Sequence, residues 1–139
     1  MPAATGEIPN RLHDISRDLQ SIAGGEAQAR EDLNEDVTVF VDAKADAHPA
    51  LEALSKQTAD VVAGKKLSDQ DAARIAHNLW TSATAKEISQ KQVEALQNDM
   101  QAVLVSIGVT EEHAQNVAAQ VGEVQKLVTN RPRRWYEFF

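Results

Sequence analysis

The chain has 139 residues, no cysteine and a formal net charge of −7. A chain of this length can bury its own core, so we expect residues 1–139 to form a single domain. The missing cysteines exclude disulfides, thiol nucleophiles, and zinc or iron–sulfur sites with cysteine ligands. The acidic excess repels a phosphate backbone, so we expect no nucleic-acid partner.

The charge is distributed unevenly along the chain. Residues 1–62 carry a net charge of −7, residues 63–129 of −2 and residues 130–139 of +2. No apolar stretch approaches the roughly 20 residues of a transmembrane helix. The segment Met1–Gly6 lacks the basic and apolar regions of a signal peptide. We therefore expect a soluble protein, cytoplasmic or exported after removal of a signal, and the sequence does not choose between the two.

Residues 8–23 carry the clearest helical pattern in the first half of the chain. Five aliphatic residues there recur at spacings of three and four, which predicts one apolar stripe on a helix. These residues are Ile8, Leu12, Ile15, Leu19 and Ile22. We expect residues 1–7 to form a flexible arm, Asn10 to cap the helix, and Gly24 with Gly25 to end it.

Two further helices are expected before residue 64, the first with less support. In residues 26–47, Leu33 and Val37 fit a helical face, but the run Val37–Val41 is also rich in strand-forming residues. We favour a helix, because a lone strand would have no evident partner for pairing. His48–Pro49 then opens the next helix, since proline suits a first helical turn, and Gly64 closes it.

Residues 67–129 show a regular pattern that predicts three helices in an up-down-up arrangement. Ser68, Ser89 and Thr110 are candidate N-caps that follow one another at intervals of 21 residues. An interval of 21 leaves room for a helix of about 17 residues and a tight turn. The apolar positions then coincide as Ile75/Leu96/Val117 and Leu79/Met100/Val121. We expect residues 8–64, as acidic N-terminal helices, to pack beside this part of the chain.

The whole pattern predicts an all-α fold, an antiparallel helical bundle of five to six helices with short loops. Small residues precede Trp80 on its helix, which places this indole in the core or, alternatively, in the wall of a ligand pocket with Met100. The second interpretation would make the protein a carrier or sensor of small ligands.

Nothing in the sequence predicts an enzyme, a cofactor or a metal site. The four histidines are never three or four residues apart, so no helix presents a pair of metal ligands. The acidic run Glu31–Asp36 lacks the spacing and the central glycine of a calcium loop, and we expect a solvated face there. The chain also lacks a glycine-rich phosphate loop and a nucleophile elbow.

The C-terminal segment, residues 130–139, is the unusual element. It holds four of the six aromatic residues of the chain together with three arginines. Three interpretations stay open: the segment covers a groove of its own bundle, docks into a protein partner or a second copy, or lies at a membrane surface, which the acidic body disfavours. We favour a protein partner or a homo-oligomer, with these candidate contact residues: Arg131, Arg133, Arg134, Trp135, Tyr136, Phe138 and Phe139.

Overall fold

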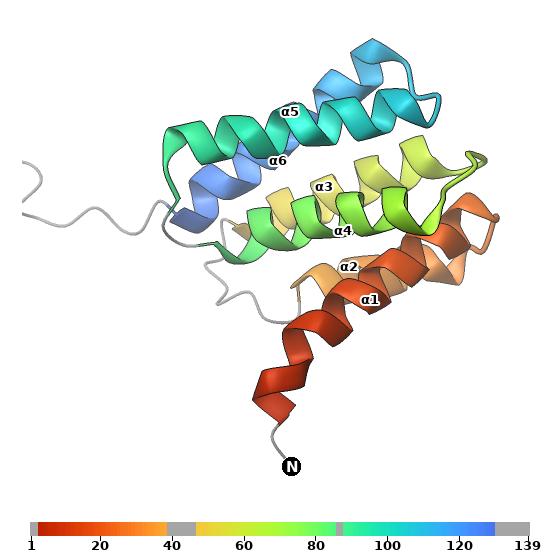
Figure 1. The fold of residues 1–139 in the computed structure, drawn as a ribbon, viewed down its shortest axis with the longest axis horizontal. Coiled ribbons are helices and arrows are strands. Elements are labelled where there is room, and N and C mark those ends of the chain that lie inside the picture. The colour runs from red at the N-terminus through yellow and green to blue at the C-terminus, as the bar shows by residue number, and fades with distance from the viewer. Residues whose placement is uncertain (1–2, 39–46, 86–87, 130–139) are drawn as a thin grey trace, which may run out of the picture.

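The computed structural model describes residues 3–38, 47–85 and 88–129, and in this part of the chain it contains six helices and no strand. The helices pack against one another as a bundle, which confirms the predicted fold class (Figure 1). They are α1 (Ala3–Ala23), α2 (Gln28–Thr38), α3 (Ala47–Val62), α4 (Asp69–Thr84), α5 (Gln90–Ser106) and α6 (Glu111–Thr129).

The start of α1 differs from the expected one. The helix begins at Ala3, so residues 3–7 are helical, and Asn10 lies inside the helix instead of capping it. Ala3 and Ala4 are strong helix formers, and the helix includes Pro9 although an interior proline lacks a backbone donor and is disfavoured there. The end of α1 is as expected. Gly25 has a φ of 98°, and the next residue, Glu26, donates its backbone N–H to the carbonyl of Ser21 at 2.9 Å.

The second helix confirms the helical interpretation of residues 28–38. Ala29, Leu33 and Val37 lie on its buried face, whereas the strand-like residues 39–41 lie outside the described part of the chain. In α3, Pro49 is the third residue, within the first turn, where backbone N–H groups have no partner in the helix. Gly64 follows the end of α3 with a φ of 78° and donates its N–H to the carbonyl of Ala23, the last residue of α1.

The three predicted N-caps are all present. The backbone N–H groups of Asp71 and Gln92 donate to Ser68 Oγ and Ser89 Oγ, each at 3.1 Å. Gln92 Oε1 also accepts from the backbone N–H of Ser89 at 2.8 Å, which completes a capping box. At α6, Thr110 Oγ1 accepts from the third helical N–H at 3.3 Å. Each cap is decided within four residues, so the sequence alone could predict it.

The helices enclose one core, to which all six contribute. Helix α4 contacts α1, α5 and α6, while α3 lies between α2 and α6 and contacts both. Consecutive helices among α4, α5 and α6 run in opposite directions (Figure 1). The six apolar residues that coincide at the 21-residue interval are all buried in this core: Ile75, Leu96, Val117, Leu79, Met100 and Val121.

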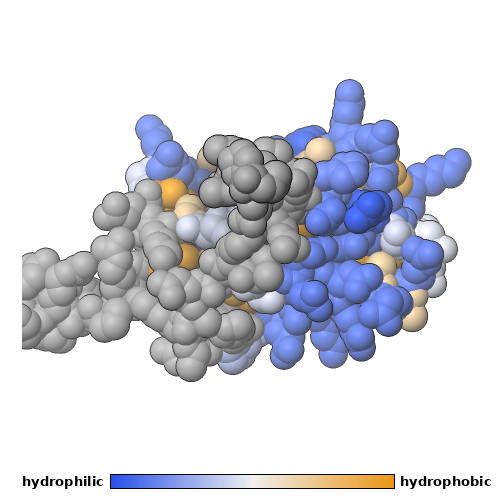
Figure 2. Space-filling model, turned by 90° about the horizontal axis from the view of Figure 1, so that it is seen from below, coloured by the Kyte–Doolittle hydropathy of each residue, from blue (hydrophilic) through white to orange (hydrophobic). Residues whose placement is uncertain are grey.

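The surface of the described residues is predominantly polar. Among the residues whose side chains the structure describes, 12–38, 49–85 and 88–128, Val105 on α5 is the one large hydrophobic residue that is exposed to solvent, with 44% of its surface accessible. Figure 2 views the molecule from below, with α1 and α2 nearest the viewer, and shows mostly hydrophilic residues on the part of that face that is coloured. Among the described helices, none combines the length and the apolar character that crossing a bilayer requires.

Candidate functional site

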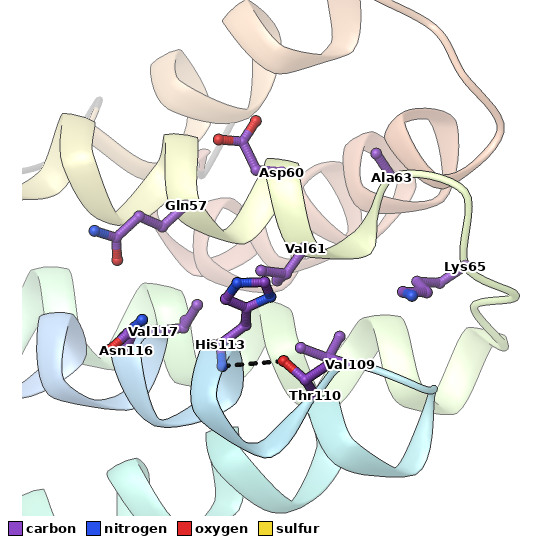
Figure 3. Close-up of a pocket in the computed structure, with 10 residues that line it drawn as sticks. All are labelled: Gln57, Asp60, Val61, Ala63, Lys65, Val109, Thr110, His113, Asn116 and Val117. Atoms are coloured by element: carbon purple, nitrogen blue, oxygen red, sulfur yellow. Dashed lines mark hydrogen bonds between the residues drawn. The ribbon is translucent and has the colours of Figure 1, made fainter.

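A pocket of about 400 Å³ opens between α3 and α6. It lies where the C-terminal half of α3 passes the first two turns of α6 (Figure 3). Its wall combines aliphatic residues with a polar rim. The lining residues are Gln57, Asp60, Val61, Ala63, Lys65, Val109, Thr110, His113, Asn116 and Val117.

The N-cap of α6 positions the residue at the centre of this pocket. Thr110 Oγ1 holds the backbone N–H of His113 at 3.3 Å and so fixes the first turn of the helix. From there the imidazole of His113 projects toward α3 and lies beside Val61 (Figure 3). Val109 and Val117 are buried beneath it. The pocket therefore offers an apolar floor with an imidazole, which can donate or accept a hydrogen bond, above it.

The charges around this α3–α6 pocket are partly balanced. Arg30 on α2 forms an ion pair with Asp60 at 2.6 Å, which offsets the charge of this carboxylate. Lys65 brings a positive charge to the other side of the rim. Gln57 Oε1 is buried and has no hydrogen-bond partner among the described residues. The pocket is therefore suited to a small amphipathic molecule that carries a hydrogen-bond donor.

A second hollow, of about 350 Å³, lies between α2 and α3. Two buried oxygen atoms there, Asn34 Oδ1 and Ser55 Oγ, have no hydrogen-bond partner in the described structure, and Ser55 is only 2% exposed. Unpaired buried polar atoms cost free energy, so a group that binds to them is favoured. The lining residues are Arg30, Glu31, Asn34, Glu52, Ser55, Lys56 and Ala59.

An unexpected pair of acids joins α1 and α2. Asp18 is only 8% exposed, and its carboxyl forms a hydrogen bond with that of Asp36. Burial, followed by this hydrogen bond and the nearby negative charges, raises the pKa of Asp18 from its usual 3.8 to about 8. The sequence contained one signal for this arrangement. Asp18 falls on the apolar stripe, between Ile15 and Ile22, where an acid does not belong.

The structure also places the residues that the sequence singled out as candidate sites. The predicted contact residues Arg131–Phe139 lie outside the described residues. Trp80 and Met100 are buried in the core, at 7% and 0% exposure, and neither lines the α3–α6 pocket or the α2–α3 hollow. Within the described residues, no three His, Asp or Glu side chains come together in a way that could hold a metal ion.

Sequence reasoning did not find either hollow. Each arises where two helices face each other, and the lining residues come from segments up to about 60 positions apart. Polar residues within the apolar face of α3, such as Ser55 beside Leu51 and Leu54, were the available signal.

Comparison with protein families, curated proteins and solved structures yields no match to this chain.

Proposed function

We propose that the chain is a non-enzymatic helical-bundle protein that mediates protein–protein interaction or self-association through its basic and aromatic C-terminal segment. One observation supports this assignment. Among residues 12–38, 49–85 and 88–128, whose side chains the structure describes, Val105 is the one large hydrophobic side chain that is exposed, and a single such residue is a weak anchor for a partner. The aromatic residues of the C-terminal segment are therefore the strongest available anchors.

The chemistry of this segment fits such a role. Trp135, Tyr136, Phe138 and Phe139 offer large apolar surfaces, and three arginines stand just before them. Aromatic residues and arginine are enriched among the residues that dominate binding energy at protein interfaces. The positive charge of the segment also complements the acidic N-terminal half of a second copy.

Deletion of residues 131–139 tests the proposal. We expect the shortened protein to keep its helical content by circular dichroism and to lose its self-association or its partners, as measured by solution mass and affinity capture. A full-length variant with the four terminal aromatic residues changed to serine should behave in the same way. If the shortened protein keeps both its mass and its partners, the proposal is wrong. If it unfolds, the segment instead closes its own bundle.

A second candidate function is the binding of a small ligand in the α3–α6 pocket. The observation that favours it is the apolar floor beneath His113, beside the unpaired Gln57 Oε1. A metabolite and lipid panel should shift the backbone amide NMR signals of His113 and Val117. Val61→Trp, which fills the pocket, should abolish the shifts, whereas Val105→Trp on the exposed face of α5 should leave them. A panel that moves none of these signals would reject this candidate.

A further inference from the structure

The α2–α3 hollow has the features of a site for a planar cation with several hydrogen-bond donors. Its two unpaired atoms, Asn34 Oδ1 and Ser55 Oγ, are both able to accept hydrogen bonds. They come from different helices and line one hollow, so a single group placed between them can reach both. A buried acceptor without a partner is costly, and the hollow therefore favours a ligand rich in N–H groups.

The charges at the rim select a cation. Glu31 and Glu52 supply a carboxylate from each of the two helices. Of the two basic residues at the rim, Arg30 already pairs with Asp60 at 2.6 Å, so its charge is offset. The other, Lys56, is exposed to solvent like both glutamates and offsets one of them, which leaves the rim with a net charge of about −1. A guanidinium carries five N–H donors in a planar fork and pairs well with carboxylates, whereas an ammonium offers a single compact charge.

We propose that the α2–α3 hollow binds the guanidinium of an arginine from residues 131–134 of a second copy of this chain. This inference rests on the function proposed above and names the receptor for the C-terminal segment. Asn34 Oδ1 and Ser55 Oγ accept hydrogen bonds from the guanidinium, and Glu31 and Glu52 balance its charge. The bundle thereby recognises its own basic segment in a head-to-tail contact.

The distance from the end of α6 to the α2–α3 hollow favours an arginine from a second copy over one from the same molecule. Gln120 on α6 donates to the carbonyl of Ala50 at the start of α3 with a distance of 3.2 Å, so the two helices are level there. From that level, α6 continues nine residues to Thr129, and Ser55 lies five residues along α3 in the opposite direction. At 1.5 Å per residue, the two points are separated by about 21 Å along the helix axes.

An arginine in the same molecule would have to cover this distance and also pass around α3, which lies between α2 and α6. Arg131 is only two residues beyond Thr129, and Arg134, with about 17 Å of fully extended backbone, would use this length and most of its side chain on the axial distance alone, which leaves nothing for the path around α3. Neither the distance nor the path around α3 limits an arginine that comes from a second copy. The inference therefore commits to an intermolecular contact.

Sedimentation velocity on the full chain over a range of concentrations provides the test. We expect a reversible association whose dissociation constant rises about tenfold when Arg131, Arg133 and Arg134 are all changed to lysine, because the charge stays but the planar fork is lost. The double variant Asn34→Ala with Ser55→Ala should weaken association to a similar extent. The double variant loses only two buried atoms without hydrogen-bond partners, so it should remain folded. Circular dichroism checks this. The matched control is Asn98→Ala with Ser106→Ala on α5, which should associate like the parent.

The outcomes separate this inference from the function on which it rests. If deleting residues 131–139 abolishes association while the lysine and hollow variants leave it unchanged, the segment binds elsewhere and only the inference fails. A full chain that is monomeric at every concentration overturns the contact between copies. If, in that monomer, the amide NMR signals of Asn34 and Ser55 respond to the lysine substitutions, the arginine comes from the same molecule and the inference is also wrong.

Discussion

The carboxyl groups of Asp18 and Asp36 form a hydrogen bond between α1 and α2, in a place where Asp18 is almost fully buried. Two carboxyl groups can form such a bond only if one of them carries a proton. Asp32 and Asp14 add further negative charge nearby and so favour the protonated state of Asp18. The contact between α1 and α2 therefore depends on pH.

The first prediction concerns Asp18→Asn. With the pKa of Asp18 near 8 in the folded state and 3.8 as its ordinary value, the folded protein retains a proton that the unfolded chain releases between these limits. Stability therefore falls as pH rises from about 4 to about 8, by up to about 1.4 kcal/mol per pH unit from this group. Asparagine keeps a hydrogen-bond donor and cannot ionise. We expect the variant to be more stable than the parent at pH 8.5, by at least about 2 kcal/mol.

Urea unfolding at pH 5 and pH 8.5 measures this difference. Asp60→Asn is the matched control, because Asp60 is exposed, pairs with Arg30 at 2.6 Å and is not among the charges that act on Asp18. It should show no comparable gain at the higher pH. Equal pH dependence of the parent and the Asp18 variant would show that the buried carboxyl does not titrate in this range.

The second prediction concerns Asp99, which links α4 to α5. Asn78 Nδ2 donates to Asp99 Oδ2 at 2.9 Å, and Arg74 Nη2 donates to Asp99 Oδ1 at 2.5 Å. Burial acts to raise the pKa of Asp99, but these hydrogen bonds and the nearby positive charge outweigh it and lower the pKa below 3.8. The stabilisation is thus present at neutral pH and is lost as pH falls through the folded pKa.

We expect Asp99→Asn to cost about 1 kcal/mol at pH 7, since the pair is partly exposed and screened by water. The cost should shrink as pH falls through the folded pKa of Asp99 and in high salt, as thermal unfolding at several pH values and salt concentrations would show. A penalty that does not change with pH or salt would mean that the charge of Asp99 contributes nothing.

The third prediction concerns Gly122, where α6 passes close to α5. A Cβ atom at this position would collide with Gln97 Nε2, the same atom that donates to the carbonyl of Ala118 at 3.0 Å. Gly122→Ala gains about 1 kcal/mol of helix propensity but displaces the amide of Gln97. We expect a net effect near zero in the parent and a gain of about 1 kcal/mol in a Gln97→Ala background. A double-mutant cycle by urea unfolding measures this coupling, and purely additive effects would contradict the close approach.

The fourth prediction compares two helix caps. Ser89→Ala removes the 3.1 Å bond that Ser89 Oγ accepts from the backbone N–H of Gln92 within the capping box of α5, whereas Thr110→Ala removes a longer bond of 3.3 Å on α6. We expect a loss of about 1 kcal/mol or more for Ser89→Ala and a smaller loss for Thr110→Ala. The urea midpoints of the two variants decide the order. Ser106→Ala, at the last residue of α5, removes no N-cap and serves as the reference.

The caps and the burial pattern could be predicted from sequence because both are decided within a single helix. Ser68 and Ser89 need only the next three residues to cap their helices, and the apolar stripe of α1 needs only its own periodicity. The start of α1 was mispredicted for a related reason. Asn10 has the chemistry of a cap, but a cap forms only where the preceding backbone leaves the helix, and here it does not.

The features that could not be predicted all depend on contacts between residues of two different helices. Asp18 meets Asp36, which is 18 positions away on another helix, and no single-helix pattern pairs these two residues. The α3–α6 pocket likewise depends on where Val61 lies relative to His113, and this follows from packing angles that the sequence does not show.

The hydrogen bonds between α4, α5 and α6 fix the positions of these helices along one another. The faces that these helices bury are rich in alanine, including Ala76, Ala83 and Ala114. Such smooth faces allow one helix to slide along another by a turn, about 5.4 Å, with little change in apolar contact. The bonds from Asn78 to Asp99 and from Gln97 to Ala118 hold near the middle of their helices and break in any shifted arrangement. A few hydrogen bonds thus fix the sliding position that the apolar core alone leaves undecided.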